Sequence, residues 1–192
     1  MNIKSFVFLL GLFSIPTLAQ VYPEHYALIS AKSNGEEVAK FKVWYSDKGE
    51  RLETDVPIVS MIITQYDNKE QFLLYPQSKT YIEIPFVKTV DPRKNSKYSC
   101  EDLKQQETFL NRKVEIWKCG SDVLETSVNM WFDKETGIIL KSVDPETEQT
   151  TMEVLELKLA DQPDELFLIP DDYKLKVAKE VDPPEPPLLI EP

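Results

Sequence analysis

The stretch VAKFKVWY (residues 38–45), followed by SDKG (residues 46–49), carries the pattern that decides the fold. Its odd-numbered residues are all apolar or aromatic, whereas its even-numbered residues include two lysines. Alternation with a period of two is typical of a β-strand that buries one face. The segment that follows is typical of a turn, in which Gly49 can adopt a positive φ. The sequence therefore predicts a hairpin that returns through Arg51–Thr54.

The same alternation recurs along most of the chain and predicts about nine or ten strands in hairpin order. Glu101–Thr108 is compatible with either a short helix or a polar strand. We therefore expect a mainly β fold, a curved antiparallel half-barrel sheet with one or two short helices, because a long sheet must curl to cover one face. The further predicted strands are Ile58–Tyr66, Gln71–Tyr75, Thr80–Ile84, Arg112–Cys119, Leu124–Phe132, Ile138–Val143 and Thr150–Leu159, with a closing segment at Asp164–Tyr173.

Composition, net charge and the motifs absent from the sequence narrow the classes of function. The 192 residues are 42% hydrophobic, which suffices for one domain with a core. The net charge of −11 repels phosphate backbones, so we expect no nucleic-acid partner. No nucleophile elbow, phosphate-binding glycine loop or zinc-protease motif is present in the sequence. We therefore expect a protein that is not an enzyme and that holds neither a cofactor nor a metal.

The N-terminus has the pattern of a secretory signal peptide. Lys4 precedes the apolar run Phe6–Ile15, and Thr17-Leu18-Ala19 offers small residues before a cleavage site at Gln20. A run of this length is too short to cross a bilayer, which requires roughly 20 residues. The sequence predicts a signal peptide over 1–19, a single β domain over 20–178 and no transmembrane segment. We expect a periplasmic protein.

The C-terminus is rich in proline. Residues 179–192 contain Pro183-Pro184, Pro186-Pro187 and Pro192, which cannot join a sheet interior or a helix. We interpret this segment as a disordered tail, with a polyproline ligand for an aromatic groove as the alternative.

Two cysteines, Cys100 and Cys119, remain in a chain expected to be exported. A disulfide is the simplest pairing in an oxidising compartment, and a hairpin turn near Leu110-Asn111 would bring the two strands together. The alternatives are a reactive thiol or a metal site. The only histidine, His25, lies far away in sequence and near the mature N-terminus, where we expect it at the surface.

The tryptophans alternate with aliphatic neighbours, so both faces of some strands carry apolar side chains. One face packs in the core, and the other meets either a second core layer, a bound acyl chain or a partner. We expect one concave apolar surface to be lined or backed by a set of nine side chains: Trp44, Trp117, Trp131, Phe41, Val43, Ile62, Leu74, Met130 and Phe132.

Several segments, taken in order, resemble the lipoprotein-carrier superfamily of LolA-type periplasmic chaperones. They are Lys42–Arg51, Ile62–Tyr66, Phe72–Tyr75 with Pro76 and Lys79-Thr80-Tyr81, Asn111–Trp117, Met130–Gly137 with Ile138–Lys141, and Pro163–Phe167 with Ile169-Pro170 and Tyr173. The resemblance implies a half-open antiparallel barrel whose apolar concave face, covered by helices, shelters acyl chains. In this sequence Tyr22–Lys32 shows no long amphipathic helix.

These observations together favour an exported, non-enzymatic binding protein of the cell envelope. Its expected partner is a lipid, a lipoprotein acyl chain or another hydrophobic ligand, with peripheral membrane contact as a compatible feature. The alternative is a protein-interaction module, such as a sensor or subunit of an envelope complex, that uses the same sheet to hold an envelope protein.

Overall fold

The computed structural model describes residues 22–56, 61–86, 91–121 and 126–176. Its strands form one twelve-stranded sheet, and the helical elements of the described residues are two 3₁₀ turns. The elements are β1 His25–Ser33, β2 Glu36–Tyr45, β3 Gly49–Thr54, β4 Met61–Gln65, β5 Glu70–Tyr75, β6 Thr80–Ile84, η1 Pro92–Lys94, β7 Ser99–Phe109, β8 Arg112–Ser121, β9 Thr126–Asp133, β10 Ile139–Val143, β11 Thr150–Leu159, η2 Asp164–Phe167 and β12 Lys174–Leu175.

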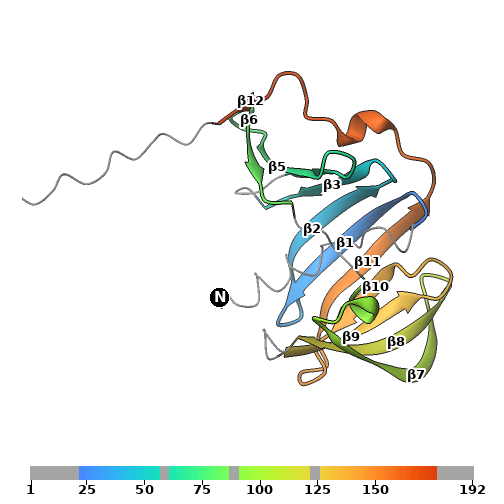
Figure 1. Cartoon of the computed structure of the whole chain (residues 1–192). Helices are drawn as coiled ribbons and strands as arrows, with labels where there is room; N and C mark the ends of the chain where they lie inside the picture. The colour runs from blue at the N-terminus through green and yellow to red at the C-terminus, as the bar shows by residue number, and fades with distance from the viewer. Residues whose placement is uncertain (1–21, 57–60, 87–90, 122–125, 177–192) are drawn as a thin grey trace, which may run out of the picture.

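The sheet consists of two meanders that are joined side by side. The strand order is β12-β6-β5-β4-β3-β2-β1-β11-β10-β9-β8-β7, and every neighbouring pair is antiparallel except β12 with β6. β1 pairs with both β2 and β11, so the first strand lies in the middle of the sheet. The sheet is open and strongly curved, with β3–β6 at one end and β7–β9 at the other (Figure 1). This architecture confirms the mainly β, curved antiparallel fold.

The structure defines the secondary structure of two segments for which the prediction from sequence was open or approximate. The ambiguous segment Glu101–Thr108 is a strand, part of β7. The closing segment Asp164–Tyr173 is mainly the turn η2 and a connection to β12, and it lies across the outside of β3–β6. The predicted signal peptide over 1–19 and the proline-rich tail over 179–192 lie outside the described residues. In the part of the chain that is described, no helix is long and apolar enough to cross a bilayer.

Gly49 is required for a different reason from the one expected. Its φ is not positive, so the turn does not depend on the left-handed conformation. A Cβ at this position would lie 2.2 Å from the carbonyl oxygen of Thr64, and 3.4 Å from the side chain of Phe167. The glycine therefore allows β3 and β4 to approach closely beneath the C-terminal segment.

The apolar side chains form three clusters. The largest spans β1–β3 and β8–β11 and includes Phe41, Val43, Leu52 and Trp131. The second lies on β4 and β5, where Ile169 and Tyr173 of the C-terminal segment pack against it. The third surrounds the disulfide on β8 and β9.

Cys100 and Cys119 are bonded, as the sequence predicted, and they are direct partners on β7 and β8 with a Cα–Cα distance of 4.1 Å. The two strands meet at a tight turn in which Leu110 and Asn111 have φ values of 51° and 58°. If the pairing of Phe109 with Arg112 continued along both strands without interruption, Cys100 would lie opposite residue 121.

A bulge on β7 corrects the register. Asp102 pairs with Trp117, but Gln105 pairs with Ile116, so Leu103 and Lys104 are extra residues. The Asp102 Oδ1 atom accepts a hydrogen bond of 2.8 Å from the Lys104 backbone N–H, and Lys104 has a φ of 57°. These two extra residues shift the pairing by two positions and bring the cysteines opposite each other.

Candidate ligand-binding face

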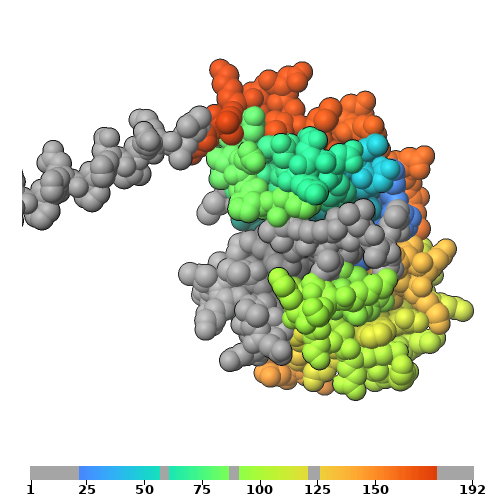
Figure 2. All heavy atoms as spheres, in the orientation of Figure 1, coloured from blue at the N-terminus to red at the C-terminus, as the bar shows by residue number. Residues whose placement is uncertain are grey.

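The two faces of strands β1–β6 differ in what covers them. Ile63, Phe72 and Leu74 face the C-terminal segment, whose side chains bury them. In Figure 2 the orange atoms of this segment rest on the outer side of these strands. The opposite face, which carries Val43 and Leu52, is called the inner face here.

An apolar row runs across the inner face without interruption. Its members are direct cross-strand partners on seven neighbouring strands, from β11 through β1 to β6. Burial is greatest in the middle of the row, where Val43 and Leu52 are buried. Leu157 at one end is half-buried, as are Ile62, Leu73 and Ile82 toward the other. In order across the sheet, the row is Leu157, Ala27, Val43, Leu52, Ile62, Leu73 and Ile82.

A polar row lies directly beside the apolar row. Its members are also direct partners and occupy the same face two residues along each of these strands. Gln71 donates a hydrogen bond of 3.0 Å to the Thr64 hydroxyl, which links two neighbouring strands. In order, the polar row is His25, Tyr45, Glu50, Thr64 and Gln71.

Glu50 is the exceptional member of this row. Its side chain is buried, with 8% of its surface exposed, and it accepts one long hydrogen bond of 3.4 Å from the Tyr66 hydroxyl. Among the described residues no lysine, arginine or histidine forms an ion pair with it. Burial raises the pKa of Glu50 to about 8, and the hydrogen bond from Tyr66 lowers it only in part.

Four aromatic rings surround this end of the polar row, with Tyr45 at the centre. Its ring stacks on His25 at 5.3 Å and meets Tyr22 edge-on at 5.8 Å. Tyr66 is tilted against it at 6.0 Å. Burial raises the pKa of Tyr45 to about 12, with a further increase from the nearby carboxyl of Glu50.

His25 is buried, with 2% of its surface exposed, so the expectation of a surface histidine is wrong. The physical reason is that β1 is a central strand, paired on both sides, and not a chain end at the sheet margin. Burial lowers the pKa of His25, although Nδ1 lies 2.9 Å from the Pro23 carbonyl oxygen and can donate to it. The neutral imidazole is therefore the favoured form.

The nine side chains predicted to line or back one concave surface lie on both faces of the sheet. Phe41, Val43 and Ile62 lie on the inner face. Trp44 points to the opposite face, because adjacent residues of a strand alternate, and there it pairs with Arg51. Leu74 also lies on that face, in the cluster beneath the C-terminal segment.

The remaining four lie at the β8–β9 end of the sheet. Trp117, Met130 and Phe132 share the cluster that contains the disulfide. Trp131 belongs to the largest cluster and donates its Nε1–H to Glu107 Oε2 over 3.0 Å.

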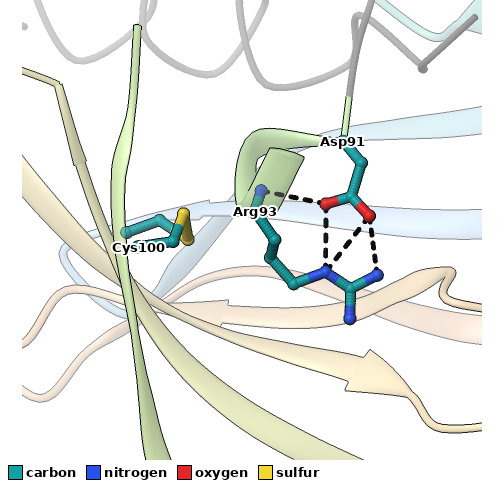
Figure 3. Close-up of a disulfide and its surroundings, with 4 residues drawn as sticks. Asp91, Arg93 and Cys100 are labelled. Atoms are coloured by element: carbon teal, nitrogen blue, oxygen red, sulfur yellow. Dashed lines mark hydrogen bonds and ion pairs between the residues drawn. A yellow bond between two sulfur atoms is a disulfide. The ribbon is translucent and has the colours of Figure 1, made fainter. Parts of the chain in front are cut away.

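The cluster at the disulfide is covered by η1. Figure 3 shows Arg93 beside the disulfide, in a bidentate ion pair with Asp91. Asp91 is 2% exposed, and its Oδ1 also caps the turn by accepting from the Arg93 backbone N–H. The Arg93 guanidinium lies 3.9 Å from the centre of the Phe132 ring and 5.7 Å from that of Trp117. These side chains are therefore occupied by the protein itself.

A third buried carboxyl, Asp133, lies at the β9–β10 turn. It is 2% exposed, and its Oδ2 accepts hydrogen bonds from Arg112 over 2.8 Å and from both the backbone and the hydroxyl of Thr136. Burial raises its pKa, but these donors outweigh that effect and lower it overall. A shallow polar depression of about 510 Å³ adjoins it, lined partly by Arg112 and Glu135. Nowhere in the described ranges do three histidine, cysteine or carboxylate side chains gather as metal ligands would.

Comparison with known proteins supports the fold alone. No family model and no curated protein matches this chain. Its structure is similar to that of PNGF-II in two crystal forms, with 12% and 15% sequence identity and TM-scores of 0.51 and 0.50. The matches cover 81% and 83% of this chain but 31% and 32% of PNGF-II, so the chain spans about a third of that protein. A DUF1329 family protein from Desulfovibrio piger matches at 11% identity over 77% of this chain and 90% of its own, with a TM-score of 0.35.

The likeness to PNGF-II concerns the fold alone, and in this chain that fold is an open, curved antiparallel sheet (Figure 1). Sequence identities this low carry no statement about ligand or activity.

Sequence reasoning missed the polar row. One signal was available, since Glu50 lies two residues before Leu52 and shares its phase in an alternating strand. A carboxylate in phase with a core leucine indicates a buried charge, but its surroundings depend on pairing between strands.

Proposed function

We propose that this chain is an exported, non-enzymatic binding protein of the cell envelope, which holds the apolar part of a lipid or another hydrophobic ligand. The observation that carries the proposal is the apolar row on the inner face. Ile62, Leu73 and Ile82 are half-buried members of this row. Ile62 packs against the largest apolar cluster, whereas Leu73 and Ile82 belong to none of the three clusters of described residues. A row of aliphatic side chains on a curved face suits a linear hydrocarbon chain.

The magnitude of the hydrophobic effect is sufficient for such binding. Burial of each methylene contributes roughly 0.8 kcal/mol. Micromolar affinity requires about 8 kcal/mol, so about ten buried methylenes suffice before other costs are counted. A dodecyl chain is therefore a suitable probe.

The LolA-like assignment and the periplasmic location are parts of the same proposal. The order of the resembling segments supports the former, and the signal-peptide pattern together with the Cys100–Cys119 disulfide supports the latter. Sequencing the N-terminus of the exported protein should give Gln20 as the first residue. An intact Met1 on the mature protein would contradict export through a cleaved signal peptide.

The binding test uses dodecyl maltoside below its micellar concentration, followed by calorimetry. We expect saturable binding to the wild-type protein and at least tenfold weaker binding to Leu73→Asp, which places a charge in the apolar row. Leu168→Asp is the matched control, because Leu168 is 57% exposed and follows η2 on the outside of the sheet. Equal affinities for all three proteins, or no binding at all, would contradict the proposal.

The interaction-module alternative is distinguished by what copurifies. Extractable lipid in the protein purified from its native envelope supports the carrier. A stoichiometric polypeptide without lipid supports the module.

A further inference from the structure

In the part of the chain that the structure describes, no cationic side chain pairs with the buried carboxyl of Glu50. It lies in the polar row immediately beside the apolar row, between its partners Tyr45 and Thr64. Burying an ionised carboxylate without a cation is costly, and proteins normally pair such a group or keep it neutral. Among the described residues, the Glu50 side chain accepts one hydrogen bond, the long one from Tyr66.

The rings around Glu50 provide a second feature. Tyr22, His25 and Tyr66 all contact the ring of Tyr45, which is the direct neighbour of Glu50 across β2 and β3. Aromatic faces attract cations through their quadrupole, and several rings with one carboxylate are the usual components of an ammonium site. The same rings offer little to an anionic group.

The arrangement of the two rows suggests how one ligand could use both. The apolar row passes through Leu52 and the polar row through Glu50, two residues apart on β3. A hydrocarbon chain along the first row would therefore have its head group beside the second.

We propose that Glu50, with the rings of Tyr45 and Tyr66, binds the ammonium head group of a cationic amphiphile whose hydrocarbon chain lies along the apolar row. This inference rests on the proposed function, because it takes the inner face as the binding surface. It adds the charge class of the ligand, which the apolar row alone does not determine.

Access to the carboxyl depends on Tyr66. Tyr22 and Tyr45 are each 5% exposed, whereas Tyr66 is half-buried at the turn between β4 and β5. Tyr66 is therefore the ring that moves aside most readily when a head group reaches Glu50. In the free protein its hydroxyl supplies the hydrogen bond that the ligand would replace with an ion pair.

Binding of a cation should also change the protonation state of Glu50. Since the pKa of Glu50 is raised to about 8, the carboxyl is mostly protonated at pH 7 in the free protein. An ammonium group favours the ionised form, so the carboxyl releases its proton to the solvent as the ligand binds. The charged groups near the rings are Asp47 beside Tyr45, and Asp91 and Arg93 beside Tyr22.

The test compares dodecyltrimethylammonium with dodecyl maltoside, which have hydrocarbon chains of the same length. We expect the wild-type protein to bind the cationic amphiphile at least tenfold more tightly at pH 7. Glu50→Gln should lose this preference and keep its affinity for dodecyl maltoside. Glu53→Gln is the matched control, because Glu53 lies on the same strand but points to the opposite face, where it pairs with Arg51.

Calorimetry at pH 7 in two buffers with different ionisation enthalpies gives the second readout. Close to one proton should be released for each dodecyltrimethylammonium bound by the wild-type protein, and none by Glu50→Gln. Equal affinities for both amphiphiles, tighter binding of dodecanoate, or a preference retained in Glu50→Gln would overturn the inference while leaving the proposed function intact. Failure of every amphiphile to bind would overturn both.

Discussion

The two buried carboxyls of this sheet, Asp133 and Glu50, are held in opposite ways. Asp133 receives donors from Arg112 and Thr136, which lower its pKa despite burial. Glu50 receives one long hydrogen bond, and burial raises its pKa to about 8. The difference shows that burial alone does not decide the charge state of a carboxyl, because the donors within reach determine whether the ionised form is stabilised.

The two carboxyls also differ in how much they contribute to the fold. Asp133 joins β9 to the following turn and to the start of β8, so its hydrogen bonds hold three chain segments together. Within the described ranges, the side chain of Glu50 has a single hydrogen-bond partner, the Tyr66 hydroxyl. A group that is costly to bury and contributes little to the fold is a candidate for a role in binding.

The largest expected effect is the pH dependence caused by Glu50. Its pKa is higher in the folded protein than the usual value of 4.5, so its contribution to stability is full below pH 4.5 and is lost as pH rises to about 8. At pH 9 Glu50→Gln should raise the free energy of unfolding by at most on the order of 5 kcal/mol, since one pKa unit corresponds to about 1.4 kcal/mol. Urea unfolding between pH 6.5 and pH 9 measures this slope, and a slope unchanged in Glu50→Gln would contradict it.

Asp133→Ala should have the opposite effect and destabilise the protein at neutral pH. The substitution leaves Arg112 without its buried partner and removes the acceptor of Thr136. Breaking this buried pair should lower the free energy of unfolding by about 3 kcal/mol. This value is at the lower end of the usual range because the Arg112 side chain is 22% exposed. Urea unfolding at pH 7 measures it, and a loss below about 1 kcal/mol would show that these hydrogen bonds are weak.

The disulfide crosslinks the end of the sheet that holds Asp133 and not the end that holds Glu50. Replacing Cys100 and Cys119 with serine should cost on the order of 3 kcal/mol, since the bond closes a loop of about 20 residues. This loss should be independent of the gain from Glu50→Gln at pH 9, so the two changes should add within error, because the two sites lie in different meanders. Strong coupling between them would mean that the two ends of the sheet do not act independently.

His25 should give the smallest effect. Burial lowers its pKa, so its contribution to stability is full above pH 6.5 and is lost as pH falls below that value. Between pH 4.5 and pH 6.5 this loss opposes the gain from Glu50. In His25→Gln this opposition is removed, so stability should rise more steeply as pH falls from 6.5 to 4.5, while the slope between pH 6.5 and pH 8 remains. The same dependence in His25→Gln and the wild-type protein between pH 4.5 and pH 6.5 would contradict this role of His25.

Local features of this fold were predictable from the sequence, whereas features that depend on pairing between distant strands were not. Alternation gave the strands of both meanders, and Leu110-Asn111 gave the turn that brings Cys100 and Cys119 together. The exact pairing of the cysteines depends on the two extra residues of β7, whose effect cannot be read without the partner strand.

The inner face illustrates what sequence reasoning could not supply. The nine predicted lining residues were chosen as apolar and aromatic, but Val43 and Trp44 are adjacent in one strand and necessarily point to opposite faces. The apolar row is a property of register across seven strands. His25 and Glu50 became neighbours of Tyr45 only through that register.

Titration of Glu50 itself shows whether an uncompensated carboxyl lies beside the apolar row. The ¹³C chemical shift of the side-chain carboxyl, assigned by comparison with Glu50→Gln, reports its ionisation across the pH range. We expect a midpoint near 8 in the free protein and a lower midpoint when the protein is saturated with dodecyltrimethylammonium. A midpoint near the usual value of 4.5 in the free protein, unchanged by the amphiphile, would contradict this expectation.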